Sequence, residues 1–141
     1  MKSYKYSELL ARMDEAIKEE YFLEANWIAY SILEDRLTSI LKESGGGHEK
    51  IRMLGPKLIE IKARSIDNLN MRKAFFGDMF IKVELWKNKR NELMHAMADE
   101  SKTTAQIDTD SMTLAIEGNE ITRTLCAACR RFKKFNSKPI K

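Results

Sequence analysis

Two prolines and six glycines are the only strong helix breakers among the 141 residues, and they leave a few long uninterrupted stretches between them. These stretches are rich in Leu, Glu, Lys, Ala and Met, which lose little conformational freedom on entering a helix. No strand-like alternation of apolar and polar residues persists beyond four positions. We therefore expect an all-α fold.

Hydrophobic periodicity predicts four long helices. Apolar residues recur at helical spacing over residues 6–20, 22–43, about 78–98 and about 110–135. Ser44-Gly45-Gly46-Gly47 is expected to end the second helix, and the polar residues 100–108 to form the loop before the last one. Between residues 51 and 76 the pattern is interrupted, which predicts short helical pieces, one of them opening near Pro56. With 43% hydrophobic and 33% charged residues, residues 1–141 have the composition of a single domain.

The sequence also indicates where the protein works. No apolar run approaches the roughly 20 residues needed to cross a bilayer, and the N-terminus lacks the continuous apolar core of a signal peptide. We expect a cytoplasmic protein without a membrane partner. Cys126 and Cys129 have the spacing of zinc and redox motifs, but they fall inside a predicted helix with no second ligand pair, so they are expected to pack as small apolar residues. No metal or other cofactor is predicted.

The net charge of +4 is concentrated at the C-terminal end. After Glu120 the chain has no acidic residue and seven basic ones, namely Arg123, Arg130, Arg131, Lys133, Lys134, Lys138 and Lys141. Such a stretch favours a polyanion, with RNA or DNA the usual candidate. A solvated helix end whose cations suit the helix dipole would explain the same residues.

Arg90 interrupts the apolar face of the predicted third long helix. At 100° per residue that face contains Met79, Val83, Trp86, Leu93, Met94 and Met97. A guanidinium at a core-facing position is costly unless it is paired, or unless the face lines a cleft or a second subunit. One interpretation is a structural ion pair with an acid of the second helix, such as Glu34, and the other is a functional site.

Arg90, Asn91 and His95 form the pattern R-N-x-x-x-H on this helix. The pattern resembles the signature of the HEPN superfamily, whose members are small helical domains, many of them metal-independent RNA endonucleases that act as toxins or in antiviral defence. The order of helices is also similar to that family, with two long helices, a helix that holds the motif and a last long helix. The resemblance implies a HEPN-like helical bundle, RNA as the substrate, a homodimer whose two motifs form one composite site, and an antitoxin or other regulatory protein as partner.

These residue types suit RNA cleavage without a metal. The 2′-hydroxyl of RNA attacks the adjacent phosphate when a group removes its proton, another stabilises the added negative charge, and a third protonates the leaving oxygen. Histidine titrates close to neutral pH, so His95 is the candidate acid and base. Arg90 can hold phosphate oxygens bidentately. Asn91 lies one helical turn before His95 and can hold the imidazole or the substrate.

Further residues are expected to support this site. Glu34 resembles an acidic position found near the motif in relatives, where it would orient Arg90 or His95. The expected RNA-binding residues are Lys87, Lys89, Arg130, Arg131, Lys133 and Lys134. Met97 stands where some family members have a tyrosine that a partner nucleotidyltransferase modifies, so control by that route is not expected.

The spacing of the motif favours a second copy of the chain. Five residues on a helix separate Arg90 and His95 by about 140° around its axis, so the two side chains do not share one face. Two protomers that bring their motif helices together would remove this difficulty. Two other functions stay open: a helical module that binds a protein or nucleotide without cleaving it, and a nucleic-acid-binding protein that uses only its basic end.

Overall fold

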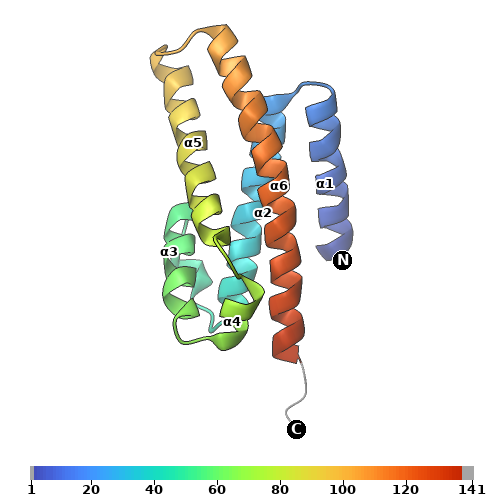
Figure 1. Ribbon diagram of the computed structural model, residues 1–141, viewed down its shortest axis with the longest axis vertical. Helices are drawn as coiled ribbons and strands as arrows, with labels where there is room; N and C mark the ends of the chain where they lie inside the picture. Colours follow the sequence, from blue (N-terminus) through green and yellow to red (C-terminus); the bar gives the residue numbers. More distant parts are fainter. Residues whose placement is uncertain (1, 138–141) are drawn as a thin grey trace.

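The computed structural model describes residues 2–137 of the chain, with side chains from residue 5, and this part is all-helical (Figure 1). Within it are six α-helices and one 3-10 helix: α1 (Lys2–Lys18), α2 (Phe22–Glu43), η1 (His48–Lys50), α3 (Leu54–Ser65), α4 (Leu69–Ala74), α5 (Met79–Asp99) and α6 (Thr104–Ser137). The expectation of an all-α fold is confirmed. Among the described residues, every helix is too short or too polar to cross a bilayer.

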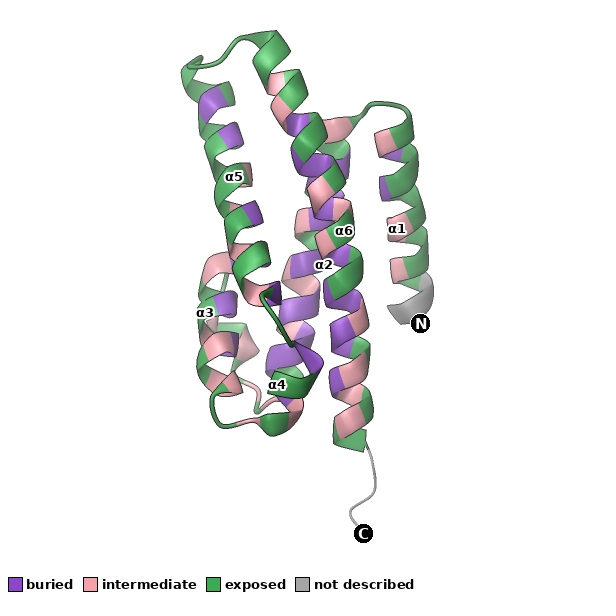
Figure 2. Ribbon diagram, in the orientation of Figure 1, coloured by how far each residue is buried: buried purple, intermediate pink, exposed green. Residues whose placement is uncertain are grey.

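Helices α2 and α6 lie side by side and run in the same direction through the middle of the molecule (Figure 1). Near their starts the Asn26 amide donates to the carbonyl of Ser111 over 3.1 Å, and near their ends the Asn136 amide donates to Glu43 over 3.4 Å. Helix α1 covers one side of this pair and α5 the other, while α3 and α4 pack at the lower end. The buried faces of all these helices meet in one hydrophobic core (Figure 2).

Helix α1 is attached to this pair by polar contacts as well as by its apolar face. Asp14 accepts hydrogen bonds from Asn119 and from Arg123 of α6, the latter over 2.6 Å. The guanidinium of Arg36, a residue of α2 that is 6% exposed, lies 4.2 Å from the ring centre of Tyr6. A buried cation over an aromatic face is stabilised by the ring quadrupole, so this contact ties α1 to α2.

Helices α5 and α6 form a hairpin in which Gly118 of α6 lies against Trp86 of α5. Trp86 of α5 is 1% exposed, and its indole nitrogen donates to the carbonyl of Leu114 over 2.9 Å. A side-chain carbon at Gly118 would lie 2.9 to 3.0 Å from three atoms of the Trp86 ring. The absence of a side chain at Gly118 therefore sets how closely the motif helix approaches α6. The far end of this hairpin extends beyond the turn between α1 and α2 and is largely exposed (Figure 2).

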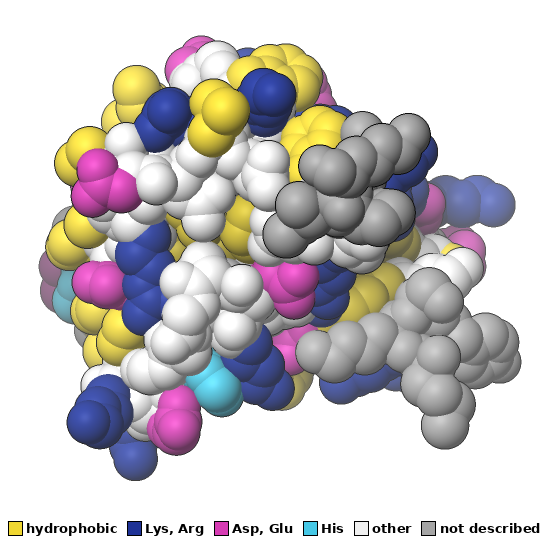
Figure 3. All heavy atoms as spheres, turned by 90° about the horizontal axis from the view of Figure 1, so that it is seen from below, with side chains coloured by type: hydrophobic (Ala, Val, Ile, Leu, Met, Phe, Trp, Pro, Cys, Tyr) yellow, Lys and Arg dark blue, Asp and Glu magenta, His cyan; other side chains and the backbone are white. Residues whose placement is uncertain are grey.

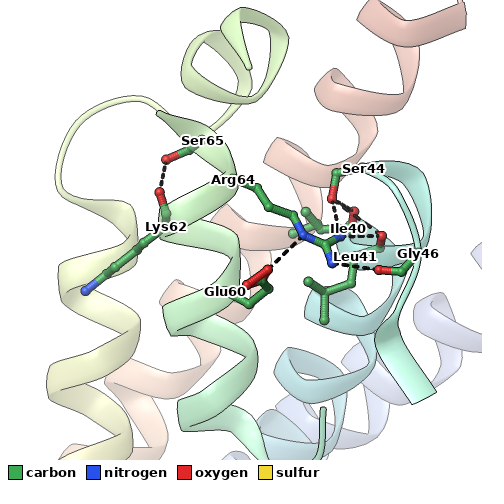
Figure 4. A network of polar contacts seen from close by, with 8 residues as sticks. All are labelled: Ile40, Leu41, Ser44, Gly46, Glu60, Lys62, Arg64 and Ser65. Atoms are coloured by element: carbon green, nitrogen blue, oxygen red, sulfur yellow. Dashed lines mark hydrogen bonds and ion pairs between the residues drawn. The ribbon is translucent and has the colours of Figure 1, made fainter. Parts of the chain in front are cut away.

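The glycine run ends α2, as predicted. Gly45, Gly46 and Gly47 all have φ between +77° and +127°, a region that glycine enters without steric cost. Arg64 of α3 then binds the freed end of α2 (Figure 4): its guanidinium donates to the carbonyls of Leu41 and Gly46 and to the hydroxyl of Ser44, over 2.6 to 3.1 Å. The run is a helix C-cap held by an arginine from the next helix.

The prediction for the last helix was wrong at its start. Residues 100–108 were expected to be a loop and α6 to begin near Asp110, but α6 begins at Thr104. Thr103 and Gln106 exchange two hydrogen bonds, from the Gln106 N–H to the Thr103 hydroxyl and from the Thr103 N–H to the Gln106 side chain. This capping box starts the helix earlier than hydrophobic periodicity indicates, because the first turns of α6 are exposed and need no apolar pattern.

Smaller differences affect other helices. Helix α1 begins at Lys2 rather than near residue 6. The predicted apolar face of α5 is buried at Met79, Val83, Trp86 and Leu93, but Met94 and Met97 are 48% and 38% exposed. At this end of α5 the buried residues are Leu93 and Ala96, so the buried face is narrower there than predicted.

The two cysteines are buried free thiols on α6, as expected. Burial raises the pKa of the Cys129 thiol to about 12, and it also raises the pKa of the Cys126 thiol. They pack as small core residues.

Candidate functional site

The sequence motif lies on α5, and the position of α5 is set by its buried face. Val83, Trp86 and Leu93 are at most 4% exposed and pack into the core. One turn after Trp86, Arg90 leaves α5 towards α2 and is half-buried. The packing of Trp86 therefore determines where the guanidinium of Arg90 lies.

Arg90 rests on an aromatic ring of α2. Its guanidinium carbon lies 4.0 Å from the ring centre of Tyr30, and one of its nitrogens is 3.4 Å from the side-chain oxygen of Asn91. Among residues 5–137 no carboxylate lies within ion-pair distance of it. The expected structural ion pair between Arg90 and Glu34 is therefore wrong.

Glu34 instead neutralises a different cation. Lys57, in the first turn of α3, is 7% exposed and places its ammonium nitrogen 3.1 Å from a carboxylate oxygen of Glu34. A buried ammonium costs more free energy to leave unpaired than a half-buried guanidinium that an aromatic ring already stabilises. Glu34 was expected to orient Arg90 or His95, but its side chain contacts Lys57 and neither of those residues.

His95 lies on a different side of α5 from Arg90. It is exposed, and no hydrogen bond or ion pair joins it to Arg90 within the described part of the chain. Asp99 follows it by four residues, one turn along α5. The pKa of Asp99 is lowered chiefly by hydrogen bonds from Ser101 and to a smaller extent by the charge of His95.

Asn91 is exposed beside Arg90, and its amide oxygen faces the guanidinium. The expectation that Asn91 holds the imidazole of His95 is not met in this arrangement, since the side-chain contact that it makes is with Arg90. One helix thus offers two chemically distinct sides, with Arg90 towards α2 and His95 towards solvent, and the exposed Asn91 lies between them.

The two lysines next to the motif lie on different sides of α5. Lys89 points to α6 and pairs with Glu117 over 3.2 Å. Lys87 is half-buried, and its ammonium lies over Gly55 in the first turn of α3. Lys87 lies on the side of α5 that faces α3 and precedes Arg90 by one turn, whereas Lys89 is occupied by an acid.

The basic C-terminal end is less available than its sequence suggests. Arg131 donates to the carbonyl of Ala74 over 2.8 Å and covers the ring of Phe76 at 4.9 Å, so it holds α4 and the following linker against α6. Arg123 is paired with Asp14. Lys133 is half-buried, Arg130 and Lys134 are exposed, and Lys138 and Lys141 lie outside the described residues.

Figure 3 shows how the charges are distributed on the end of the molecule where α6 ends. On the face where α6 ends, Lys and Arg side chains are interrupted by acidic, hydrophobic and uncharged ones. The visible part of this face therefore shows no continuous basic surface.

A groove of about 630 Å³ lies between the first half of α5 and α6. Its apolar lining includes Phe76, Met79, Leu85, Trp86, Ile121 and Ala127, and neither Arg90 nor His95 lines it. Among the described residues no group of three or more His, Cys, Asp or Glu side chains is arranged to hold a metal ion.

Comparisons with models of protein families, with curated proteins and with solved structures give no match for this chain.

Two residues important to the site were not identified from the sequence. Tyr30 is one of the residues that recur at helical spacing over residues 22–43, which places it on the inner side of the second helix but does not mark it as part of a site. Lys57 had no distinguishing signal, because a lysine in the first turn of a short helix is usually solvated. Both depend on how α2, α3 and α5 meet, which periodicity within one helix does not specify.

Proposed function

We propose that this chain is a HEPN-type endoribonuclease that needs no resident metal and acts as a homodimer in the cytoplasm. The observation that supports it is the state of Arg90: a half-buried guanidinium held on the Tyr30 ring, with no acid among the described side chains to neutralise it. A structural arginine at such a position is normally paired. An arginine that is held in place but retains its charge is suited to binding a phosphate.

The proposed chemistry divides between the two sides of α5. Arg90 binds phosphate oxygens as negative charge accumulates on them, and His95 transfers protons to and from the sugar hydroxyl and the leaving oxygen. Since the two residues of one chain lie on different sides of the helix, His95 of one protomer would act beside Arg90 of its partner. The helices α1, α2, α5 and α6 would then form a HEPN-like bundle, and the two copies of α5 the dimer interface.

The test is cleavage of RNA in the presence of EDTA, followed by analysis of the product ends. We expect products with 2′,3′-cyclic phosphate ends from the wild-type chain, and none from His95→Ala or Arg90→Ala. His48→Ala is the matched control, because His48 is in a short 3-10 turn outside the motif, and it should cleave like the wild type. If all four proteins are equally inactive, or equally active, the nuclease proposal fails.

A non-catalytic module that binds a protein or nucleotide partner is the second candidate. The observation that favours it is the exposure of Trp27, Met94 and Met97 next to or along the motif helix, at 69%, 48% and 38%. In that case Arg90→Ala would weaken partner binding in a pull-down with no cleavage by the wild type. A role as a toxin or defence component, with a neutralising partner, follows only from the first candidate.

A further inference from the structure

Trp27 is a tryptophan of α2 whose side chain is 69% exposed, in contrast to Trp86, which is 1% exposed. A single exposed apolar side chain needs no explanation by itself. Its position distinguishes it, since Trp27 precedes Tyr30 by three residues. Side chains three apart on a helix are neighbours, with about 5–6 Å between their β-carbons. Trp27 therefore lies beside the ring on which the guanidinium of Arg90 rests.

Met94 occupies the corresponding position on α5. Helix α2 runs parallel to α6 and α5 forms a hairpin with α6, so α2 and α5 are antiparallel. With Tyr30 and Arg90 in contact, one turn back along α2 leads to Trp27 and one turn forward along α5 leads to Met94. Both side chains are exposed, at 69% and 48%. An apolar indole and a thioether thus adjoin a cation that no described acid neutralises.

From this juxtaposition we infer that Trp27 is a stacking platform for an unpaired base of the RNA whose phosphate Arg90 holds. This inference rests on the proposed function and names the substrate as single-stranded RNA. An aromatic face can stack on a base only when that base is not already stacked and paired within a duplex. The flexible thioether of Met94 suits the opposite side of the same base.

The experiment uses the full chain with His95→Ala, so that RNA is bound without being cut. The ligand is a single-stranded 2′-O-methyl RNA dodecamer, compared with the same strand in a duplex. Because Trp86 is buried, quenching of tryptophan emission reports chiefly on Trp27. We expect the single strand, and not the duplex, to quench the emission. The affinity of each variant is measured by fluorescence anisotropy of the same strand labelled with fluorescein, because variants at Trp27 lack the reporting indole. Trp27→Ala should weaken binding of the single strand about 5- to 150-fold, the range that loss of one base–aromatic stack produces.

Two further variants separate stacking from other effects. Trp27→Phe keeps an aromatic face and should retain most of the affinity. Phe76→Ala removes another exposed aromatic side chain, which is 62% exposed and lines the groove between α5 and α6. It should leave the affinity for the single strand unchanged. Unchanged binding by Trp27→Ala would overturn the inference. So would a change from dimer to monomer in sedimentation that Trp27→Ala causes and Phe76→Ala does not, since that would assign Trp27 to a protein interface.

The outcomes also separate this inference from the proposed nuclease. Binding of the single strand that depends on Trp27, with no cleavage by the wild-type chain, would support the platform and refute the nuclease. Cleavage by the wild type, together with binding that Trp27→Ala does not weaken, would support the nuclease and refute the platform. Absence of any binding by the protein with intact Trp27 would refute the platform.

Discussion

Gly118 is the position where a single methyl group should reveal what sets the distance between α5 and α6. In an exposed helix, Gly→Ala stabilises by about 1 kcal/mol, because alanine has the higher helix propensity. At Gly118 the new carbon would meet Cζ2, Nε1 and Cε2 of Trp86 at 2.9 to 3.0 Å. Trp86 is 1% exposed and hydrogen-bonded to α6, so a shift of its ring away from the new carbon would disturb that bond and the packing around it.

Overpacking of this kind costs about 1–3 kcal/mol. The clash should therefore equal or exceed the gain in propensity, and we expect Gly118→Ala to lower the free energy of unfolding by up to about 2 kcal/mol. For a domain of this size that is a decrease of up to about 7 °C in Tm. Urea denaturation followed by circular dichroism at 222 nm measures the first quantity, and a thermal scan measures the second.

A double-mutant cycle tests the cause. Trp86→Phe removes the indole atoms that the new carbon would meet, so Gly118→Ala should cost less in that background, with a coupling energy of about 1 kcal/mol or more. Thr113→Ala, an exposed substitution on the same helix, controls for propensity and should not destabilise. A stabilising Gly118→Ala, or an equal cost in both backgrounds, would refute the argument that Gly118 sets the approach of the motif helix.

Three other predictions concern contacts away from α5. Arg64→Met should lower the free energy of unfolding by about 1–3 kcal/mol in urea, since it leaves the end of α2 without its charged donor; a change below the error of the measurement would contradict this. Thr103→Ala should cost about 1 kcal/mol and speed amide hydrogen exchange in the first turn of α6, and unchanged exchange there would argue against the capping box. Because burial raises the pKa of Cys129 to about 12, the unfolded thiol loses its proton first. The buried, protonated thiol of Cys129 therefore stabilises the folded state fully below about pH 8.5. This stabilisation is lost as the pH rises towards 12, by up to about 1.4 kcal/mol per pH unit. Urea denaturation at pH 8 and pH 10.5 should show a smaller pH dependence for Cys129→Ala than for the wild type, and identical dependence would be contrary to the prediction.

The helices could be predicted from the sequence wherever one of their faces is buried. The second and fifth α-helices have such faces, and their expected limits of 22–43 and about 78–98 agree with Phe22–Glu43 and Met79–Asp99. The start of α6 was placed six residues late because its first turns are exposed, so that no apolar residue had to recur there. The signal for that start was the pair Thr103 and Gln106, whose reciprocal hydrogen bonds depend on residue type at a fixed spacing rather than on hydrophobicity.

The residues of the candidate site could be predicted from the sequence, but the side chains that contact them could not. Periodicity on α5 alone identified Arg90 as a cation on an apolar face, and helical geometry alone separated it from His95. Which side chain of α2 meets Arg90 depends on the register of two helices that are far apart in sequence. Tyr30 and Glu34 are one turn apart on α2, so a shift of one turn would have exchanged an aromatic ring for a carboxylate beside the same guanidinium.

The carboxylate one turn from Tyr30 is already paired with another cation. Glu34 binds the buried ammonium of Lys57 over 3.1 Å. The guanidinium, whose charge is delocalised and weakly hydrated, is stable on a ring without an acid. Arg90 therefore keeps its full charge at a half-buried position beside an exposed indole. An ion pair with Glu34 would have held the same arginine in place with its charge cancelled, and a phosphate would then have had to displace the carboxylate before it could bind.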